Sequence, residues 1–67
     1  MLPEVKDPEQ RVNVALAIMK TVAEGLCSIC RALVADRINL VGNRQDVKYA
    51  EKSVGDVQEL ARHCPGE

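Results

Sequence analysis

Four side chains that could bind a metal ion or carry thiol chemistry lie in two short segments, Cys27-Ser28-Ile29-Cys30 and His63-Cys64. Three thiols and one imidazole are enough soft or borderline ligands for a tetrahedral zinc site. The spacing differs from that of common zinc modules, because the second pair is adjacent and far along the chain. We therefore interpret the cysteines as reduced thiols in an apolar core, where free cysteine packs as a small hydrophobe. A disulfide from Cys64 and a metal site at Cys27, Cys30, His63 and Cys64 are the alternatives; no cofactor is predicted.

Redox or hydrolytic catalysis is not favoured by these residues. A thioredoxin-like motif needs its first cysteine at a helix N-terminus, where the dipole favours the thiolate, whereas the helix expected here runs through both Cys27 and Cys30. His63 is the only histidine, and no triad with a nucleophile and a carboxylate is suggested. We expect His63 to interact with the C-terminal end of a helix dipole, and we predict that the protein is not an enzyme.

A basic stripe is the one pattern that favours nucleic acid. Arg44, Lys48 and Lys52 recur at every fourth position and could contact phosphates. The net charge is −1, however, so the strongly basic balance typical of nucleic-acid-binding domains is missing. A solvated face with local ion pairs is the preferred interpretation, and phosphate contact is the alternative.

The longest periodic segment predicts a helix over about residues 8–38. Asp7 can cap its start, and Pro8 suits the first helical position. Apolar residues step by three and four along one face: Val12, Ala15, Met19, Val22, Leu26, Ile29 and Leu33. Further apolar residues widen this stripe to well over half of the helix surface, more than a single short helix can cover. We therefore expect the excess to be buried against another chain.

A second helix is predicted over about residues 44–63, after a break at residues 39–43 in which Gly42 can adopt positive φ and Asn43 can cap the next helix. Its apolar residues again step by three and four, and we expect it to continue through Gly55. Residues 1–6 are expected to form an arm, residues 7–64 one helical hairpin domain, and residues 65–67 a tail.

The predicted fold class is all-α: a two-helix antiparallel hairpin that dimerises into a four-helix bundle. With 67 residues and no Phe or Trp, the chain has a small aliphatic core, which in such proteins is usually supplemented by oligomerisation, disulfides or metal. The predicted oligomer seam consists of Val12, Ala15, Met19, Val22, Leu26, Ile29, Leu33, Val47, Val54 and Val57.

Larger apolar side chains at the stripe edges predict contact with a second protein, because such groups are enriched at binding sites. They are Val14, Ile18, Tyr49 and Leu60. The expected function is therefore a small non-enzymatic interaction module, a regulator, adaptor, chaperone or inhibitor of the kind found among bacterial and phage accessory proteins. The alternatives are a nucleic-acid-binding dimer and the metal-binding hairpin described above.

No basic segment followed by an apolar run marks a signal peptide at Met1, and the longest apolar stretch, Val14 to Met19, is too short to span a membrane. We accordingly expect a cytoplasmic protein with no membrane partner.

Overall fold

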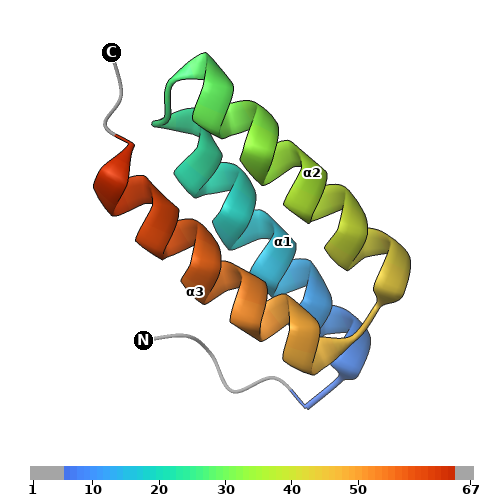
Figure 1. Cartoon of the computed structure of the whole chain (residues 1–67). Coiled ribbons are helices and arrows are strands. Elements are labelled where there is room, and N and C mark those ends of the chain that lie inside the picture. The colour runs from blue at the N-terminus through green and yellow to red at the C-terminus, as the bar shows by residue number, and fades with distance from the viewer. Residues whose placement is uncertain (1–5, 65–67) are drawn as a thin grey trace.

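Three antiparallel helices form an up–down–up bundle in the computed structural model, which describes residues 6–64. They are α1 (Pro8–Glu24), α2 (Ser28–Arg44) and α3 (Val47–His63) (Figure 1). The all-α prediction is confirmed, but the predicted two-helix hairpin is wrong because the helix expected over residues 8–38 is broken at residues 25–27. The expected arm, apart from Lys6, and the tail at 65–67 lie outside the described residues.

The first helix begins where the sequence predicts and ends earlier. The Asp7 carboxylate accepts a hydrogen bond from the Glu9 amide at 3.0 Å, with Pro8 in the first turn. Gly25 ends the helix, and its amide donates to the Val22 carbonyl at 3.1 Å. The Leu26 amide donates to the Ala23 carbonyl at 3.0 Å, so the last turn tightens before the chain reverses.

The second turn also lies later than predicted, because residues 39–43 are helical and α2 continues to Arg44. Gln45 provides the turn instead: its φ is 52°, its amide donates to the Val41 carbonyl at 3.1 Å, and its side chain donates to the Gly42 carbonyl at 2.7 Å. The cap of α3 is Asp46 rather than a residue of the predicted break, since its carboxylate accepts from the Tyr49 amide at 3.2 Å. The predicted continuity of the last helix through Gly55 is confirmed.

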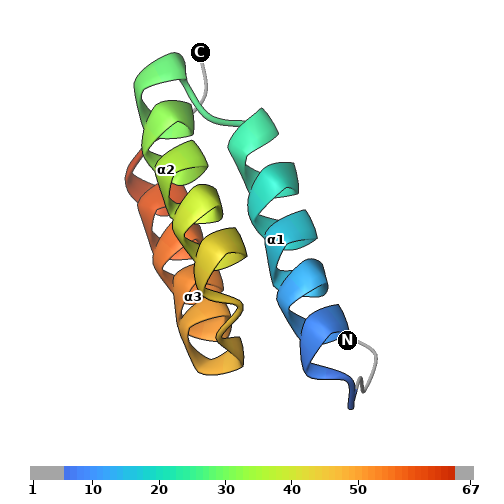
Figure 2. The ribbon, with the colours of Figure 1, turned by 90° about the vertical axis from the view of Figure 1, so that its right-hand side faces the viewer.

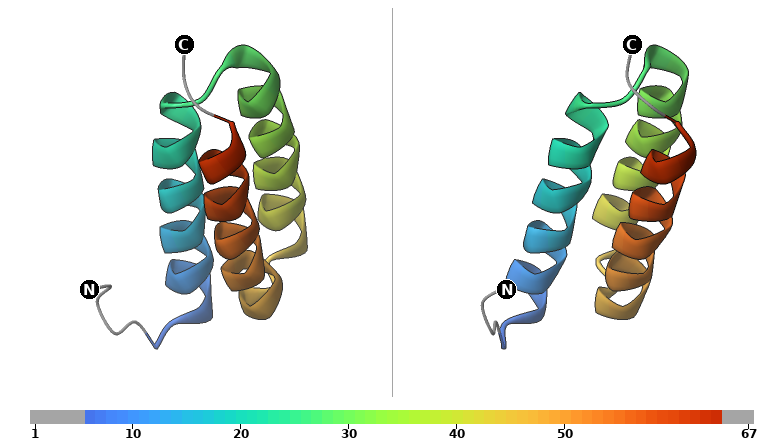
Figure 3. Two further views of the ribbon diagram at one scale, coloured as in Figure 1. Left: turned by 60° about the vertical axis from the view of Figure 1, so that its left-hand side comes forward. Right: turned by 90° about the vertical axis from the view of Figure 1, so that its left-hand side faces the viewer.

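The core lies between the three helices, which run side by side along the bundle (Figures 2 and 3). The first helix, α1, packs closely against both of the others, whereas α2 and α3 contact each other least. Its buried apolar residues are Val12, Ala15, Met19, Ala23, Leu26, Cys30, Val34, Val41, Ala50 and Val57. The wide apolar surface of α1 is thus covered by two helices of the same chain. Its width alone therefore does not require a second chain.

One buried hydroxyl in this core has no hydrogen-bond partner. Ser53 of α3 is fully buried, and its Oγ is unpaired among the described residues. Because an unsatisfied buried polar group destabilises the fold and alanine is the better helix former, we expect Ser53→Ala to raise the unfolding free energy by about 1 kcal/mol. Thermal unfolding by circular dichroism measures this change, with the exposed Ser28→Ala as the control. A loss of stability in Ser53→Ala would show that the hydroxyl is satisfied in solution.

No helix within residues 6–64 combines the length and the apolar character that crossing a membrane requires.

Candidate functional site

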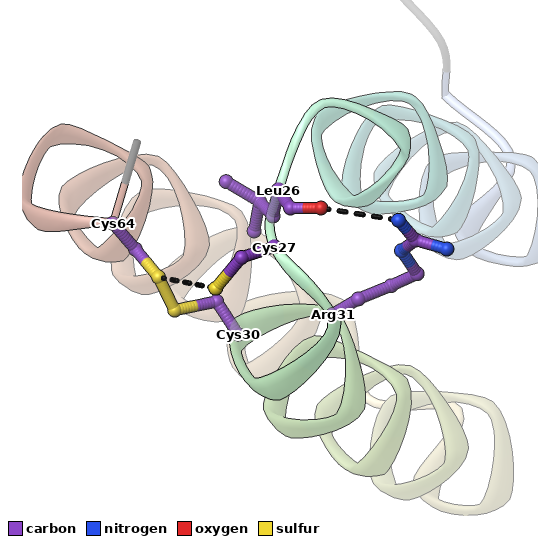
Figure 4. The surroundings of a disulfide bond; sticks show 5 residues. All are labelled: Leu26, Cys27, Cys30, Arg31 and Cys64. Carbon is purple, nitrogen blue, oxygen red and sulfur yellow. Dashed lines mark hydrogen bonds between the residues drawn. A yellow bond between two sulfur atoms is a disulfide. The ribbon is translucent and has the colours of Figure 1, made fainter. Parts of the chain in front are cut away.

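Three cysteines meet at one end of the bundle, where the chain turns from α1 to α2 and where α3 ends (Figures 1 and 4). Cys27 is the N-cap of α2, Cys30 lies in the first turn of that helix, and Cys64 is the C-cap of α3. Their sulfur atoms all lie within 4.8 Å of one another. We call these three residues the cysteine cluster.

A disulfide joins Cys30 to Cys64 across 6.6 Å between Cα atoms and ties the start of α2 to the end of α3. The interpretation of all three cysteines as reduced thiols is therefore wrong, and the disulfide alternative holds for Cys64. Cys27 is free and half-buried, with its Sγ 3.5 Å from the Cys64 Sγ. The Cys-x-x-Cys segment lies at a helix start and not deep within a helix, because the chain turns immediately before it.

The fourth predicted ligand does not join the cluster. His63 is the last residue of α3, and its Nε2 lies 3.3 Å from the Glu59 carboxylate on the exposed surface. On the other side of the turn, the Arg31 guanidinium donates to the Leu26 carbonyl at 3.2 Å and points away from the sulfur atoms (Figure 4). The structure therefore brings together three of the four predicted ligands, all of them sulfur.

A second feature is the outer surface of α2, where Ile29, Leu33 and Leu40 are 74%, 54% and 50% exposed. We call these three residues the α2 apolar face. Leu33 also borders a groove of about 310 Å³ between α2 and α3, across which Arg37 and Asp56 form an ion pair at 3.6 Å. No other helix within residues 6–64 covers this face. Its members are the most exposed large apolar side chains of the described residues.

No protein-family model, curated protein or solved structure matches this chain. Among residues 6–64, the cysteine cluster is the one group of three or more metal-ligating side chains, and the α2 apolar face is the one set of exposed large hydrophobics.

The turn at residues 25–27 divides the predicted oligomer seam into parts with different environments. Five of its members are buried inside the single chain: Val12, Ala15, Met19, Leu26 and Val57. Three are partly buried against the core: Val22, Val47 and Val54. Only Ile29 and Leu33 are exposed, and these two belong to the α2 apolar face.

The residues predicted to contact a second protein do not form one patch on a single helix. Val14 and Ile18 are half-buried one turn apart on α1, while Tyr49 and Leu60 are partly buried against the core on α3. The Tyr49 ring also carries the Arg44 guanidinium 4.3 Å above its centroid. Their role in binding stays a prediction.

The predicted basic stripe does not lie along one helix. Arg44 ends α2 and is directed over Tyr49, whereas Lys48 and Lys52 are exposed on α3. The neighbouring Glu51 pairs with Arg11 at 2.7 Å, which places a carboxylate beside the two lysines. The regular spacing of three cations is therefore interrupted by the turn at Gln45, although phosphate contact itself stays a prediction.

The α2 apolar face is missing from the sequence interpretation, because the predicted break at residues 39–43 includes Leu40. That residue continues the spacing of Ile29 and Leu33 when Asp36 fills the intervening step of a four–three–four pattern. The cysteine cluster is predicted only as an alternative, without the turn at residues 25–27 that brings its members together. Gly25, a residue type common at helix ends, is a local sign of that turn.

Proposed function

We propose that the chain is a non-enzymatic protein-interaction module whose α2 apolar face binds a second copy of the same chain. The observation that carries the proposal is the exposure of Ile29, Leu33 and Leu40 along one helix of an otherwise well-covered bundle. Isolated apolar residues are common on protein surfaces, but several large ones aligned along one helix are typical of interaction sites.

The spacing on α2 favours another helix as the bound element. Ile29, Leu33, Asp36 and Leu40 follow steps of four, three and four, which is the frame of helices packed at a shallow angle. Asp36 is the single polar member of this repeat. A polar residue at such a position fixes the register of a helix pair and lowers the stability of the pair.

Self-complementarity of the α2 apolar face favours a second copy of this chain as the partner. In an antiparallel two-fold pair of α2 helices centred between Asp36 and Arg37, Leu33 of one copy lies beside Leu40 of the other, and Ile29 lies beside Arg44 of the other. The net charge of −1 adds almost no repulsion between copies. A two-fold pair would therefore bury Leu33 and Leu40 of both copies in one contact.

Leu33→Asp tests this arrangement. We expect it to raise the dimer dissociation constant by about 100-fold or more, because each dimer loses two central apolar contacts and every 1.4 kcal/mol is tenfold. Sedimentation equilibrium over a range of micromolar concentrations measures the constant. The monomer fold should be retained, since Leu33 is more than half exposed.

Ala17→Asp is the matched control, because Ala17 is exposed in the middle of α1 and lies outside the α2 apolar face. It introduces the same charge into a helix of the same length and should leave the dissociation constant unchanged. A wild-type chain that stays monomeric at about 100 μM would contradict the proposal, because its dissociation constant would then be weaker than that of most specific associations. Equal weakening by both variants would place the interface elsewhere.

The roles of regulator, adaptor, chaperone or inhibitor belong to the same proposal, as does contact of Val14, Ile18, Tyr49 and Leu60 with a different protein. A cytoplasmic location also stays a prediction. The dimer would present α1 and α3 to such a partner, because only α2 is used in the two-fold contact.

A further inference from the structure

We propose that the cysteine cluster is a redox-gated metal site: once its disulfide is reduced, Cys27, Cys30 and Cys64 bind one Zn²⁺ ion through three thiolates. The disulfide uses only two of the three sulfur atoms and leaves the Cys27 thiol beside it without a bond. A thiophilic metal ion would use all three.

The distances suit such an ion. Two sulfur atoms bound to one tetrahedral zinc lie about 3.8 Å apart, given a zinc–sulfur distance of about 2.3 Å. The Sγ atoms of Cys27 and Cys64 are 3.5 Å apart, and all three sulfurs lie within 4.8 Å. Once the disulfide opens, the Cys30 and Cys64 sulfur atoms must separate from a bond length of about 2.05 Å to about 3.8 Å, which rotation about their side-chain bonds can supply. The distance between the Cys27 and Cys64 sulfur atoms needs to change little.

The positions of two of the cysteines suit a metal site. Cys27 and Cys30 are separated by two residues, a common spacing for a pair of zinc ligands, and both lie at the N-terminus of α2. Cys30 is buried, whereas Cys27 and Cys64 are half-buried, so the site is shielded yet reachable from solvent.

The ligand set leaves one coordination position open. No histidine, cysteine or carboxylate within residues 6–64 joins the three sulfur atoms as a fourth ligand. The His63 ring contacts the Glu59 carboxylate instead. Three protein ligands with a solvent molecule in the fourth position are a regular zinc arrangement.

The two states are connected by a balanced reaction. A dithiol reductant gives two electrons and two protons to the Cys30–Cys64 bond; the bond breaks into two thiols, and the reductant leaves as its own disulfide. Zn²⁺ then replaces the protons of three thiols, which pass to solvent, and no electron moves in this step. The same end of the bundle is tied together covalently in one state and by the metal in the other.

The experiment compares oxidised and reduced full-length chain, the latter treated with dithiothreitol and desalted without oxygen before Zn²⁺ is added. We expect one zinc per reduced chain after gel filtration, none on the oxidised chain, and thiolate-to-metal charge-transfer absorption when Co²⁺ replaces zinc. Zinc should also raise the melting temperature of the reduced chain. A reduced chain that retains no metal, or an oxidised chain that binds as well, overturns the proposal.

Cys27→Ser separates metal binding from folding, because it removes one ligand while its oxidised form keeps the Cys30–Cys64 disulfide and should melt like the oxidised wild type. We expect its reduced form to bind zinc more than about 100-fold more weakly, since losing even a hydrogen-bond partner of a ligand weakens binding about 10–100-fold. The neighbouring Ser28→Ala should bind like the wild type. Wild-type affinity in Cys27→Ser would exclude the three-sulfur site.

Discussion

Reduction of the Cys30–Cys64 disulfide in metal-free solution is expected to lower the unfolding free energy by about 4 kcal/mol. The two cysteines are 34 residues apart in the chain, and a closed loop of that length stabilises the fold by roughly this amount through the entropy of the unfolded state. The core of so small a domain supplies about 3–5 kcal/mol. The reduced chain should therefore retain only the marginal stability of its core, with a melting temperature roughly 15–30 °C below that of the oxidised chain.

Circular dichroism melts with dithiothreitol and a metal chelator measure this effect. The double variant Cys30→Ala/Cys64→Ala should melt near the reduced wild type and should not respond to reductant. Cys27→Ala is the control, because Cys27 is outside the disulfide, and it should retain most of the oxidised stability. If Cys27→Ala were as unstable as the double variant, the disulfide would involve Cys27 in solution.

Truncation of Met19 is expected to cost about 2–5 kcal/mol, because it leaves a cavity in a closely packed interior. Met19 lies in the middle of α1 and is completely buried, the largest of the fully buried side chains. A loss of this size is comparable to the whole stability of a small core, so Met19→Ala should be partly unfolded at 25 °C unless the disulfide sustains it.

Leu33→Ala is the matched comparison, since both residues belong to one apolar stripe in the sequence but Leu33 is 54% exposed. In dilute solution, where association contributes nothing, its cost should stay below about 1 kcal/mol. Urea unfolding monitored by circular dichroism measures both values. Equal losses would mean that the two residues share one environment, as in the continuous helix over residues 8–38.

Several features follow from local chemistry and are therefore readable in the sequence. The cap at Asp7 needs only a carboxylate before a proline-led first turn, and the structure contains it. The apolar repeat identifies Val12, Ala15 and Met19 as one face of a helix, and all three are buried. The continuity of α3 through Gly55 follows likewise from an unbroken repeat, because the cost of about 1 kcal/mol for one glycine is small.

The turn between α1 and α2 has only a weak local signal, Gly25. Residues 25–27 occupy about one helical turn, so the steps from Val22 to Leu26 and Ile29 keep the same phase on both sides of the break. Because one glycine costs a helix so little free energy, local interactions favour a turn at Gly25 only slightly over a helix that continues through it. Folding back is favoured by long-range burial, because it lets the wide apolar surface of α1 pack against both α2 and α3.

The cysteine cluster shows the same division. The sequence by itself determined that Cys30 is compatible with a core position, and it is buried. Which thiol pairs with Cys64 was decided only by the tertiary structure, because the turn at residues 25–27 brings the start of α2 against the end of α3. The three-and-four spacing of apolar residues indicates which side of a helix is apolar. Which helix packs on that side depends on where the chain reverses direction. That position is set by the total apolar surface buried in the bundle rather than by any local group of residues.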